Sequence, residues 1–298
     1  MRVSSVLFGV VVMVLIISIL SIWFFPSVQD FMATNSMWNG IKNFTDDFKA
    51  TIIGTVDKLP ALPENTVLIE IPYLNYNDKQ MSDIKRFVED GGTLLLMDDY
   101  GYGNEVLAYL GLEAQFSNKT LLDPLFNYKN QSMPRITDFT SDLEESGINV
   151  MTFNHATVLT NVTQSEVIAW SSAASFLDSD DNGVATDNES KGPFPVAAKF
   201  RSGKGTVAII ADPSIIISSM MDRDHNYRFI KYLTSRNGEP KEIMFDTSHL
   251  TKAPLDVSKE RLLGIREAIS SPYALVGITA MIFGVVSYYM LRKGEAIG

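Results

Sequence analysis

Two long apolar stretches frame a chain whose middle alternates between short apolar runs and amphipathic segments. Residues 3–25 and 268–291 contain no charged residue. Each stretch exceeds the roughly 20 residues that a helix needs to cross the hydrocarbon core of a membrane. The pattern therefore predicts two transmembrane helices. The first is interpreted as an uncleaved anchor, and not as a signal peptide, because its apolar run is long and no A-x-A site follows it.

Cations beside the two spans indicate their orientation. Arg2 precedes the first span, and Arg292 and Lys293 follow the second. Since short cytoplasmic segments carry the excess of Lys and Arg, we expect both termini to be cytoplasmic, with 292–298 as a tail. The protein is then a two-pass protein of the cell membrane with an extracytoplasmic main domain. That domain contains five sequons, which are possible glycosylation sites at Asn43, Asn118, Asn130, Asn161 and Asn188.

The region between the spans has the pattern of an α/β domain. Apolar residues at helical spacing predict an amphipathic helix over 27–60 that packs on this domain. Apolar runs at 67–71 and 93–97 predict buried strands, and a helical pattern over 78–89 lies between them. A strand, a helix and a strand at this spacing are typical of a mostly parallel sheet.

The second half of this region predicts a β-rich insert. Residues 115–148 are polar and predict a surface excursion. The other elements expected there are weak strands at 150–153 and 167–170, a hairpin of 196–200 and 207–211, and a helix near 225–235. We expect the α/β domain to occupy 61–240, followed by a linker and juxtamembrane helix over 241–267.

Composition excludes several kinds of site. The 298 residues carry a net charge of −10 and no cysteine. The chain therefore has no disulfide, thiolate metal site or cysteine nucleophile, and its acidity argues against nucleic acid as a partner. Its three histidines, His155, His225 and His249, are far apart in the sequence, and none has neighbours that specify a role.

Residues 178–189, DSDDNGVATDNE, carry the sharpest motif. They match a calcium-loop template at positions that would supply carboxylate and amide oxygens, the ligands that calcium prefers. A glycine lets such a loop turn back on the ion, and a solvated acidic turn is the alternative. With no clear helix on either side, we expect a lone structural calcium loop with ligands Asp178, Asp180, Asn182, Val184 (through its carbonyl) and Glu189, and with Gly183 at the turn.

Acidic residues also follow two predicted strands. Asp98 and Asp99 come after the strand at 93–97, and Asp212 comes after the strand at 207–211. Since ligands of open α/β sheets bind at the carboxyl ends of strands, these residues and Asn104 form a possible ligand site. The alternative is structural: the aspartates cap neighbouring backbone, and Asn104 caps the next helix.

Two blocks of the sequence resemble a family of archaeal and bacterial membrane proteins of unknown function. They are LPENTVLIEIPYLNYNDKQMSDIKRFVEDGGTLLLMDDYGYGNEVLAYLGL (62–112) and GPFPVAAKFRSGKGTVAIIADPSIIIS (192–218). The resemblance implies a flavodoxin-like domain similar to class I glutamine amidotransferases and to auxiliary domains of gliding-type ABC transport systems. Because the chain lacks cysteine, the resemblance does not imply glutaminase activity.

Two classes of function are open to such a chain. We expect a membrane-anchored, extracytoplasmic interaction module that is not an enzyme. It would be an accessory subunit of an envelope transport or assembly system, with a membrane-protein partner such as an ABC or AAA-type system. The alternative is an extracytoplasmic metal-assisted hydrolase or small-ligand receptor that uses Asp98, Asp99 and Asp212.

Overall fold

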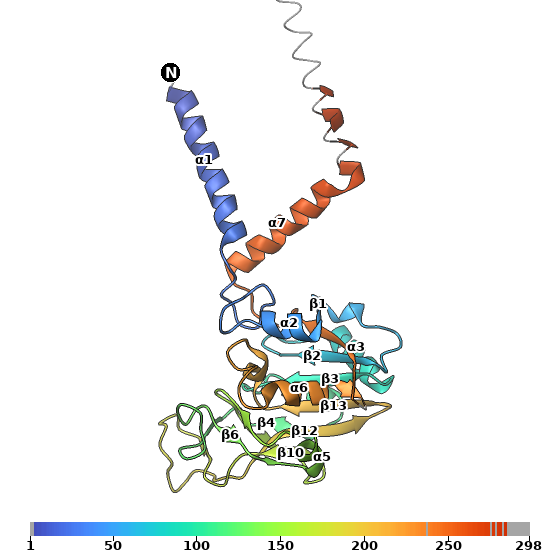
Figure 1. The fold of residues 1–298 in the computed structure, drawn as a ribbon. Helices are drawn as coiled ribbons and strands as arrows, with labels where there is room; N and C mark the ends of the chain where they lie inside the picture. Colours follow the sequence, from blue (N-terminus) through green and yellow to red (C-terminus); the bar gives the residue numbers. More distant parts are fainter. Residues whose placement is uncertain (1–2, 237, 275, 278, 282, 285–298) are drawn as a thin grey trace, which may run out of the picture. The chain divides into compact units, whose positions relative to one another are not determined.

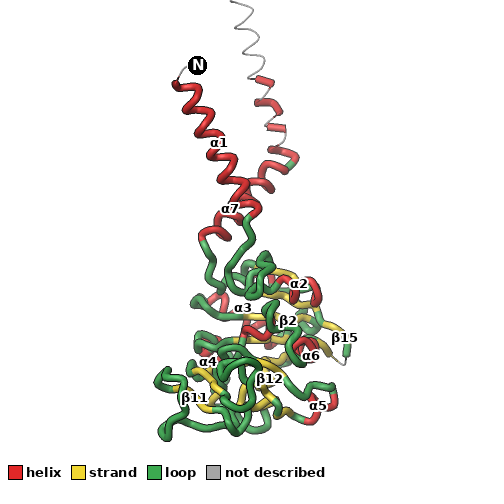
Figure 2. Tube along the Cα trace, turned by 60° about the vertical axis from the view of Figure 1, so that its left-hand side comes forward, coloured by secondary structure: helices red, strands yellow, loops and turns green. Residues whose placement is uncertain are grey.

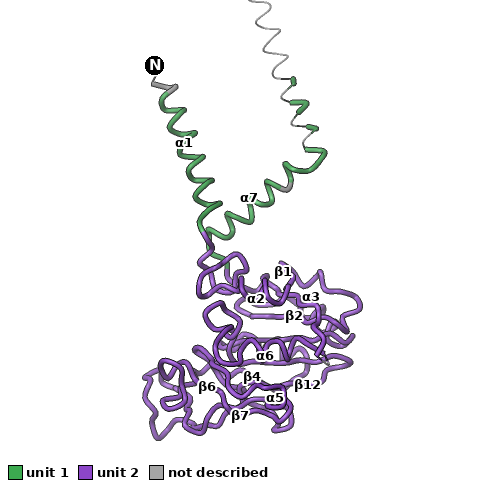
Figure 3. Tube along the Cα trace, in the orientation of Figure 1, with its two compact units in different colours: residues 1–25, 252–298 green, residues 26–251 purple. Residues whose placement is uncertain are grey.

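The computed structural model describes residues 3–284 apart from 237, 275, 278 and 282. Residues 26–251 form one unit, and residues 1–25 with 252–298 form another (Figure 3). The larger unit contains the sheet and nearly all of the buried apolar residues.

An eight-stranded mixed sheet forms the centre of the larger unit (Figure 1). Neighbouring strands are parallel in its first five positions, and the last three strands pair in antiparallel fashion. The predicted α/β class with a mostly parallel sheet is thus confirmed. In order across the sheet the strands are β1 (Thr51–Ile53), β16 (Glu242–Asp246), β2 (Thr66–Glu70), β3 (Thr93–Met97), β13 (Gly205–Ile210), β12 (Pro195–Ser202), β10 (Val167–Trp170) and β7 (Asp138–Phe139).

Helices cover both faces of the sheet (Figure 2). At Gly205 an added Cβ would lie 2.1 Å from the carbonyl oxygen of Val88, so this position faces α3 (Asp78–Glu89). The next residue, Thr206, lines a cleft together with residues of α6 (Asn226–Leu233). Since successive strand residues point to opposite faces, α3 and α6 lie on opposite sides. Every residue of β2 and β3 is buried, and burial on both faces explains why these strands are apolar apart from Thr66, Glu70 and Thr93.

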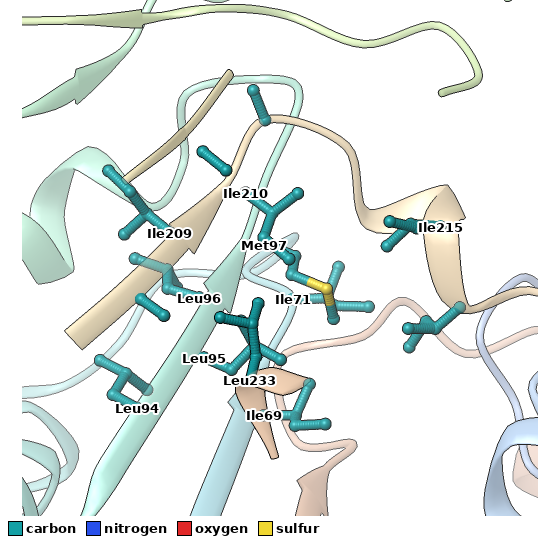
Figure 4. Close-up of a cluster of buried hydrophobic side chains, with 14 of the residues drawn as sticks. Ile69, Ile71, Leu94, Leu95, Leu96, Met97, Ile209, Ile210, Ile215 and Leu233 are labelled. Carbon is teal, nitrogen blue, oxygen red and sulfur yellow. The ribbon is translucent and has the colours of Figure 1, made fainter. Parts of the chain in front are cut away.

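The core is built from the apolar runs that the sequence shows. Figure 4 shows side chains of β2, β3 and β13 packed with Ile215 and with Leu233 of α6. The helix α3 begins at a capping box, in which Asn77 and Gln80 each accept a hydrogen bond from the other's backbone amide. The predicted helix over 78–89 agrees with the observed one.

The predicted helix over 27–60 is replaced by three short elements, α2 (Lys42–Phe48), β1 and the 3-10 turn η1 (Val56–Lys58). Lys49 ends α2 in the left-handed conformation, with φ of 54°. The following Thr51-Ile-Ile53 then pairs with β16, because β-branched residues favour strands. The apolar residues at helical spacing do face the core, since Ile41 and Phe44 are fully buried. They belong to the shorter helix α2 and to the residue just before it.

The domain also extends beyond the predicted limits of 61–240. Strand β16 lies between β1 and β2, in a segment expected to be a linker, so the unit runs from Pro26 to Thr251. The insert contains more strands than expected over 115–148. After α4 (Asn104–Tyr109) the chain forms β4 (Gln115–Phe116), β5 (Thr120–Leu122), β6 (Arg135–Ile136), α5 (Ser141–Glu145), β8 (Met151–Thr152), β9 (Leu159–Thr160) and β11 (Phe176–Asp178), and after α6 come β14 (Ser235–Arg236) and β15 (Glu239–Pro240).

The smaller unit contains α1 (Val3–Phe24) and α7 (Pro254–Ser270). Within the described residues, only the helix at Val6–Phe24 is long and apolar enough to cross a membrane. The predicted second span, 268–291, is represented there by a shorter apolar helix, Pro272–Met281. Residues 285–291 and the predicted tail, 292–298, lie outside the described part of the chain.

Candidate functional site

Carboxylates end four neighbouring parallel strands at one edge of the sheet. Asp246 ends β16, Glu70 ends β2, Asp98 and Asp99 follow β3, and Asp212 follows β13. All except Asp99 are at most 1% exposed. Because carboxyl ends of parallel strands meet at the same edge, the structure places these groups in one row, which we call the carboxyl edge.

The carboxylate oxygens of Asp98 and Asp212 accept hydrogen bonds from backbone amides. The two oxygens of Asp98 accept hydrogen bonds from the amides of Tyr100 (2.8 Å) and Gly103 (2.6 Å). Those of Asp212 accept from Ser214 (2.8 Å) and Asn154 (2.6 Å). Burial raises the pKa of both groups, to about 7 for Asp212. These contacts favour the structural interpretation, in which each carboxylate fixes the loop after its strand.

Asp99 differs from its neighbours. Its Oδ1 is buried and has no hydrogen-bond partner among the described residues. Burial raises its pKa to about 8, and the charges of Asp212 and Asp98 add to this shift. At neutral pH the Asp99 carboxyl is therefore mostly the neutral acid. It is the one member of the predicted ligand site with a buried oxygen that no hydrogen bond engages.

Asn104 does not cap α4 as expected. Its amide forms two hydrogen bonds with the backbone of Phe116, from Phe116 N to Oδ1 (2.7 Å) and from Nδ2 to Phe116 O (3.0 Å). The helix α4 begins after Gly103 without a side-chain cap. Asn104 instead ties the loop after β3 to β4.

A cluster that the sequence patterns did not predict lies at the same edge, formed by buried Glu70, Tyr76, Asp246 and His249 with half-buried Ser248. The His249 Nδ1 lies 2.8 Å from Asp246 Oδ2 and 3.6 Å from Glu70 Oε2. Tyr76 donates a hydrogen bond of 3.0 Å to Glu70 Oε2, and its ring stacks on that of His249. The signal was present in the sequence as a glutamate within an apolar run and an aspartate three positions before a histidine.

Two members of this cluster, Glu70 and His249, have raised pKa values. Burial raises the pKa of Glu70 to about 7. Burial alone would lower the pKa of His249, but its hydrogen bond with Asp246 and the nearby Glu70 carboxyl outweigh that effect and raise the pKa to about 9. One ligand atom each from Glu70, Asp246 and His249 lies within 4.8 Å of the others, a donor set that suits a divalent metal. The direct bond between His249 and Asp246 instead favours a buried ion pair.

A pH dependence of stability follows from these groups. Glu70, Asp212, Asp99 and His249 all have raised pKa values in the fold, of about 7, 7, 8 and 9. A group whose pKa is higher in the folded state than in the unfolded state contributes its full stabilisation below its unfolded-state pKa. This contribution is lost as the pH rises through its folded-state pKa. The thermal midpoint is therefore expected to fall between about pH 5 and pH 9, with Glu70 alone contributing about 3 kcal/mol.

Thermal unfolding of the full chain in neutral detergent across this range checks the prediction. Glu70→Gln removes one of the groups and should flatten the profile, whereas the exposed Glu89→Gln should leave it unchanged. A midpoint that rises between pH 5 and pH 8 would contradict the assignment.

The predicted calcium loop is held by its own hydrogen bonds. Asp178 accepts from the amides of Asn182 and Gly183, and Glu189 accepts from those of Ser179 and Thr186. Hydrogen bonds from Thr186 and Ser179 lower the pKa of Glu189. The structure brings three of the predicted ligands, Asp178, Asp180 and Glu189, within 4.8 Å of one another. The Asn182 Oδ1 bonds to the amide of Val184, whose side chain is exposed.

The calcium hypothesis predicts a stabilisation that depends on Asp180, the exposed member of this group. Saturating calcium should raise the thermal midpoint of the wild-type chain by about 5 °C. Asp180→Asn should lose this rise, while Asp181→Asn, an exposed neighbour outside the group, should keep it. Equal midpoints with and without calcium in the wild type would exclude the ion.

The remaining residues singled out from the sequence are spread over the surface or fixed locally. His225 precedes α6, and its Nδ1 accepts a hydrogen bond of 3.0 Å from the amide of Asn149. His155 lies in a loop with φ of 56°. The asparagines of all five sequons are exposed.

Comparison with known proteins places the chain in a family. Residues 33–234 match a family described as "Domain of unknown function (DUF4350)". No curated protein matches. The expected membership in a family of unknown function is thus confirmed, but nothing found supports a glutamine-amidotransferase-like domain or an ABC association.

Similar solved structures are distant. The N-terminal domain of mmIFT52 is 12% identical, with a TM-score of 0.42 over 60% of this chain and 77% of that one. The β-galactosidase from Bacillus circulans sp. alkalophilus is 15% identical, with a TM-score of 0.33 over 53% of this chain and 22% of that one. Similarities this weak assign no function.

Proposed function

We propose that this chain, which belongs to the DUF4350 family, is a membrane-anchored binding module that docks a protein partner and carries out no chemistry of its own. One observation carries the proposal: the loop at the carboxyl edge is held rigidly while it exposes tyrosines. Buried Asp98 accepts hydrogen bonds from two backbone amides of this loop and so supports it.

The exposed feature is a tyrosine ridge, formed by Tyr73, Tyr100 and Tyr102. The rings of Tyr73 and Tyr100 meet edge to face at 5.7 Å, and those of Tyr100 and Tyr102 are 6.2 Å apart. Tyr100 is 59% exposed and Tyr102 is 53% exposed. Tyrosine is enriched at the centres of protein interfaces, where its ring buries a large area at little entropic cost.

Preorganisation supports the same function. Asp98 fixes Tyr100 and Gly103 through their amides, and the ring of Phe31 packs against that of Tyr73. A loop that is already ordered loses little conformational entropy when a partner binds. The ridge therefore has the exposure and the rigidity of a docking surface.

The anchor follows from α1, which is long and apolar enough to span a membrane. We place the larger unit outside the cytoplasm in a two-pass topology, on the basis of Arg2, Arg292 and Lys293 beside the apolar stretches. A partner in the same membrane, such as an ABC or AAA-type system, fits this arrangement.

A second candidate function rests on Asp99. Its partnerless Oδ1 and its pKa of about 8 suit a general acid, or a group that binds a small ligand. The proximity of Asp98 and Asp212 would add metal-assisted hydrolysis or small-ligand binding to its possible roles. We rank it second because the oxygens of both neighbours are already engaged by backbone amides.

Capture of the partner from native membranes tests the proposed function. We expect the full chain, extracted in mild detergent, to retain a stoichiometric membrane protein that Tyr100→Ser/Tyr102→Ser loses by about tenfold or more. Tyr109→Ser is the matched control, since Tyr109 is 41% exposed and lies outside the ridge. Equal capture by the wild type and the ridge variant would refute docking through the tyrosines.

A further inference from the structure

A basic cleft lies at the end of the sheet opposite the carboxyl edge. It has a volume of about 940 Å³ and is lined by Thr93 and Thr206, at the amino-terminal ends of β3 and β13, and by β12 and α6. This size is in the range of pockets that hold small-molecule ligands. The cleft is separate from every residue of the proposed docking surface.

The lining of this cleft is strongly cationic, although the chain carries a net charge of −10. Among the described residues that line it, Glu64 is the only acidic one, and Lys204 of the β12–β13 turn is one of seven cations. Within the described residues, none of the seven forms an ion pair with an acid. The other six are Lys199 and Arg201 of β12, Arg228 and Lys231 of α6, and Arg236 and Lys241.

Several of these cations are held in place. Lys241 is half-buried, and its Nζ donates a hydrogen bond of 2.7 Å to Thr93 Oγ1. Lys199 Nζ lies 6.0 Å from the centre of the Tyr232 ring, and Arg228 donates to the carbonyl of Gly147 at 3.2 Å. Burial lowers the pKa of Lys241, and the charges of Arg236 and Lys199 lower it further. Positioned like charges without a counter-charge are unfavourable until an anion joins them.

We propose that this cleft binds a ligand with several phosphate charges, of small-molecule size. Arginine forks and lysine ammonium groups together match phosphate oxygens, and several such contacts favour a di- or triphosphate group over a single phosphate. Such a group belongs either to a soluble metabolite or to the headgroup of a lipid diphosphate. The site is independent of the tyrosine ridge and of the carboxyl edge.

Titration of the full chain in neutral detergent with inorganic tripolyphosphate tests this site, with chloride at matched ionic strength as the blank. We expect saturable binding that falls by about tenfold or more in Lys199→Gln/Arg201→Gln, because two charge-assisted contacts are lost. Both residues are exposed, so the variant should fold. Lys58→Gln/Lys129→Gln removes two exposed cations elsewhere and should change the affinity less than about twofold.

Competition distinguishes the two sources of the ligand. Farnesyl diphosphate and pyrophosphate carry the same diphosphate group. If farnesyl diphosphate displaces tripolyphosphate at lower concentration than pyrophosphate does, the site takes a lipid headgroup, and the reverse order would assign a soluble phosphate ligand. Absence of saturable tripolyphosphate binding by the wild type would overturn the proposal. So would equal loss of binding in the cleft variant and in the Lys58/Lys129 control.

Discussion

Replacing His249 with alanine is expected to lower the free energy of unfolding by about 3–5 kcal/mol. His249 is 2% exposed and supplies the only cation that contacts Glu70 and Asp246 among the described residues. Its removal leaves two buried carboxyl groups beside each other and deletes the ring that stacks on Tyr76. Chemical unfolding of the full chain in detergent, followed by tryptophan fluorescence, measures the change.

Ser248→Ala is the matched control for this prediction. The Ser248 hydroxyl bonds to the same Asp246 but carries no charge, so its loss should cost about 1 kcal/mol. The His249 variant should also lose the part of the pH dependence that lies near pH 9. Equal costs for the two substitutions would show that the buried ion pair is not formed.

Asp98→Ala is expected to cost about 2–5 kcal/mol, because it leaves the buried amide of Gly103 and the part-buried amide of Tyr100 without an acceptor. Asp98→Asn keeps one acceptor oxygen and should cost clearly less. The alanine variant should also weaken partner capture, since the loop that carries Tyr100 and Tyr102 is no longer fixed. Unfolding measurements on both variants provide the test.

Alanine and asparagine variants of equal, near wild-type stability would contradict this account of Asp98. A stable Asp98→Ala chain that has lost activity on a substrate would instead favour the catalytic candidate. The two readouts are separable, because stability is measured without any partner or substrate present.

Local patterns in the sequence were sufficient for the centre of the fold. The apolar runs of β2 and β3 and the helix between them were predicted within about one residue, because burial on both faces makes these strands almost entirely apolar. The elements over 27–60 were not predicted correctly. The helical spacing of the apolar residues there does not reveal that Thr51–Ile53 pairs with a strand nearly two hundred residues away. Pairing of β16 with β1 and β2 is tertiary information of the same kind.

The candidate site shows the same division. Asp98, Asp99 and Asp212 were recognised because each follows an apolar strand, and the structure assigns two of them to backbone amides. The cluster of Glu70, Asp246 and His249 was missed because its members come from distant segments that meet only when the sheet forms. The basic cleft was not predicted for the same reason, because its cations are scattered through the sequence of an acidic chain.

The most direct test of the binding-module account compares Asp99→Asn with Tyr100→Ser/Tyr102→Ser in one membrane extract. Because the Asp99 carboxyl is mostly neutral at pH 7, asparagine replaces it with a group of similar shape and charge. The account predicts that Asp99→Asn captures the partner as the wild type does, whereas the tyrosine variant loses it. Loss of partner capture by Asp99→Asn, together with unchanged capture by the tyrosine variant, would contradict it.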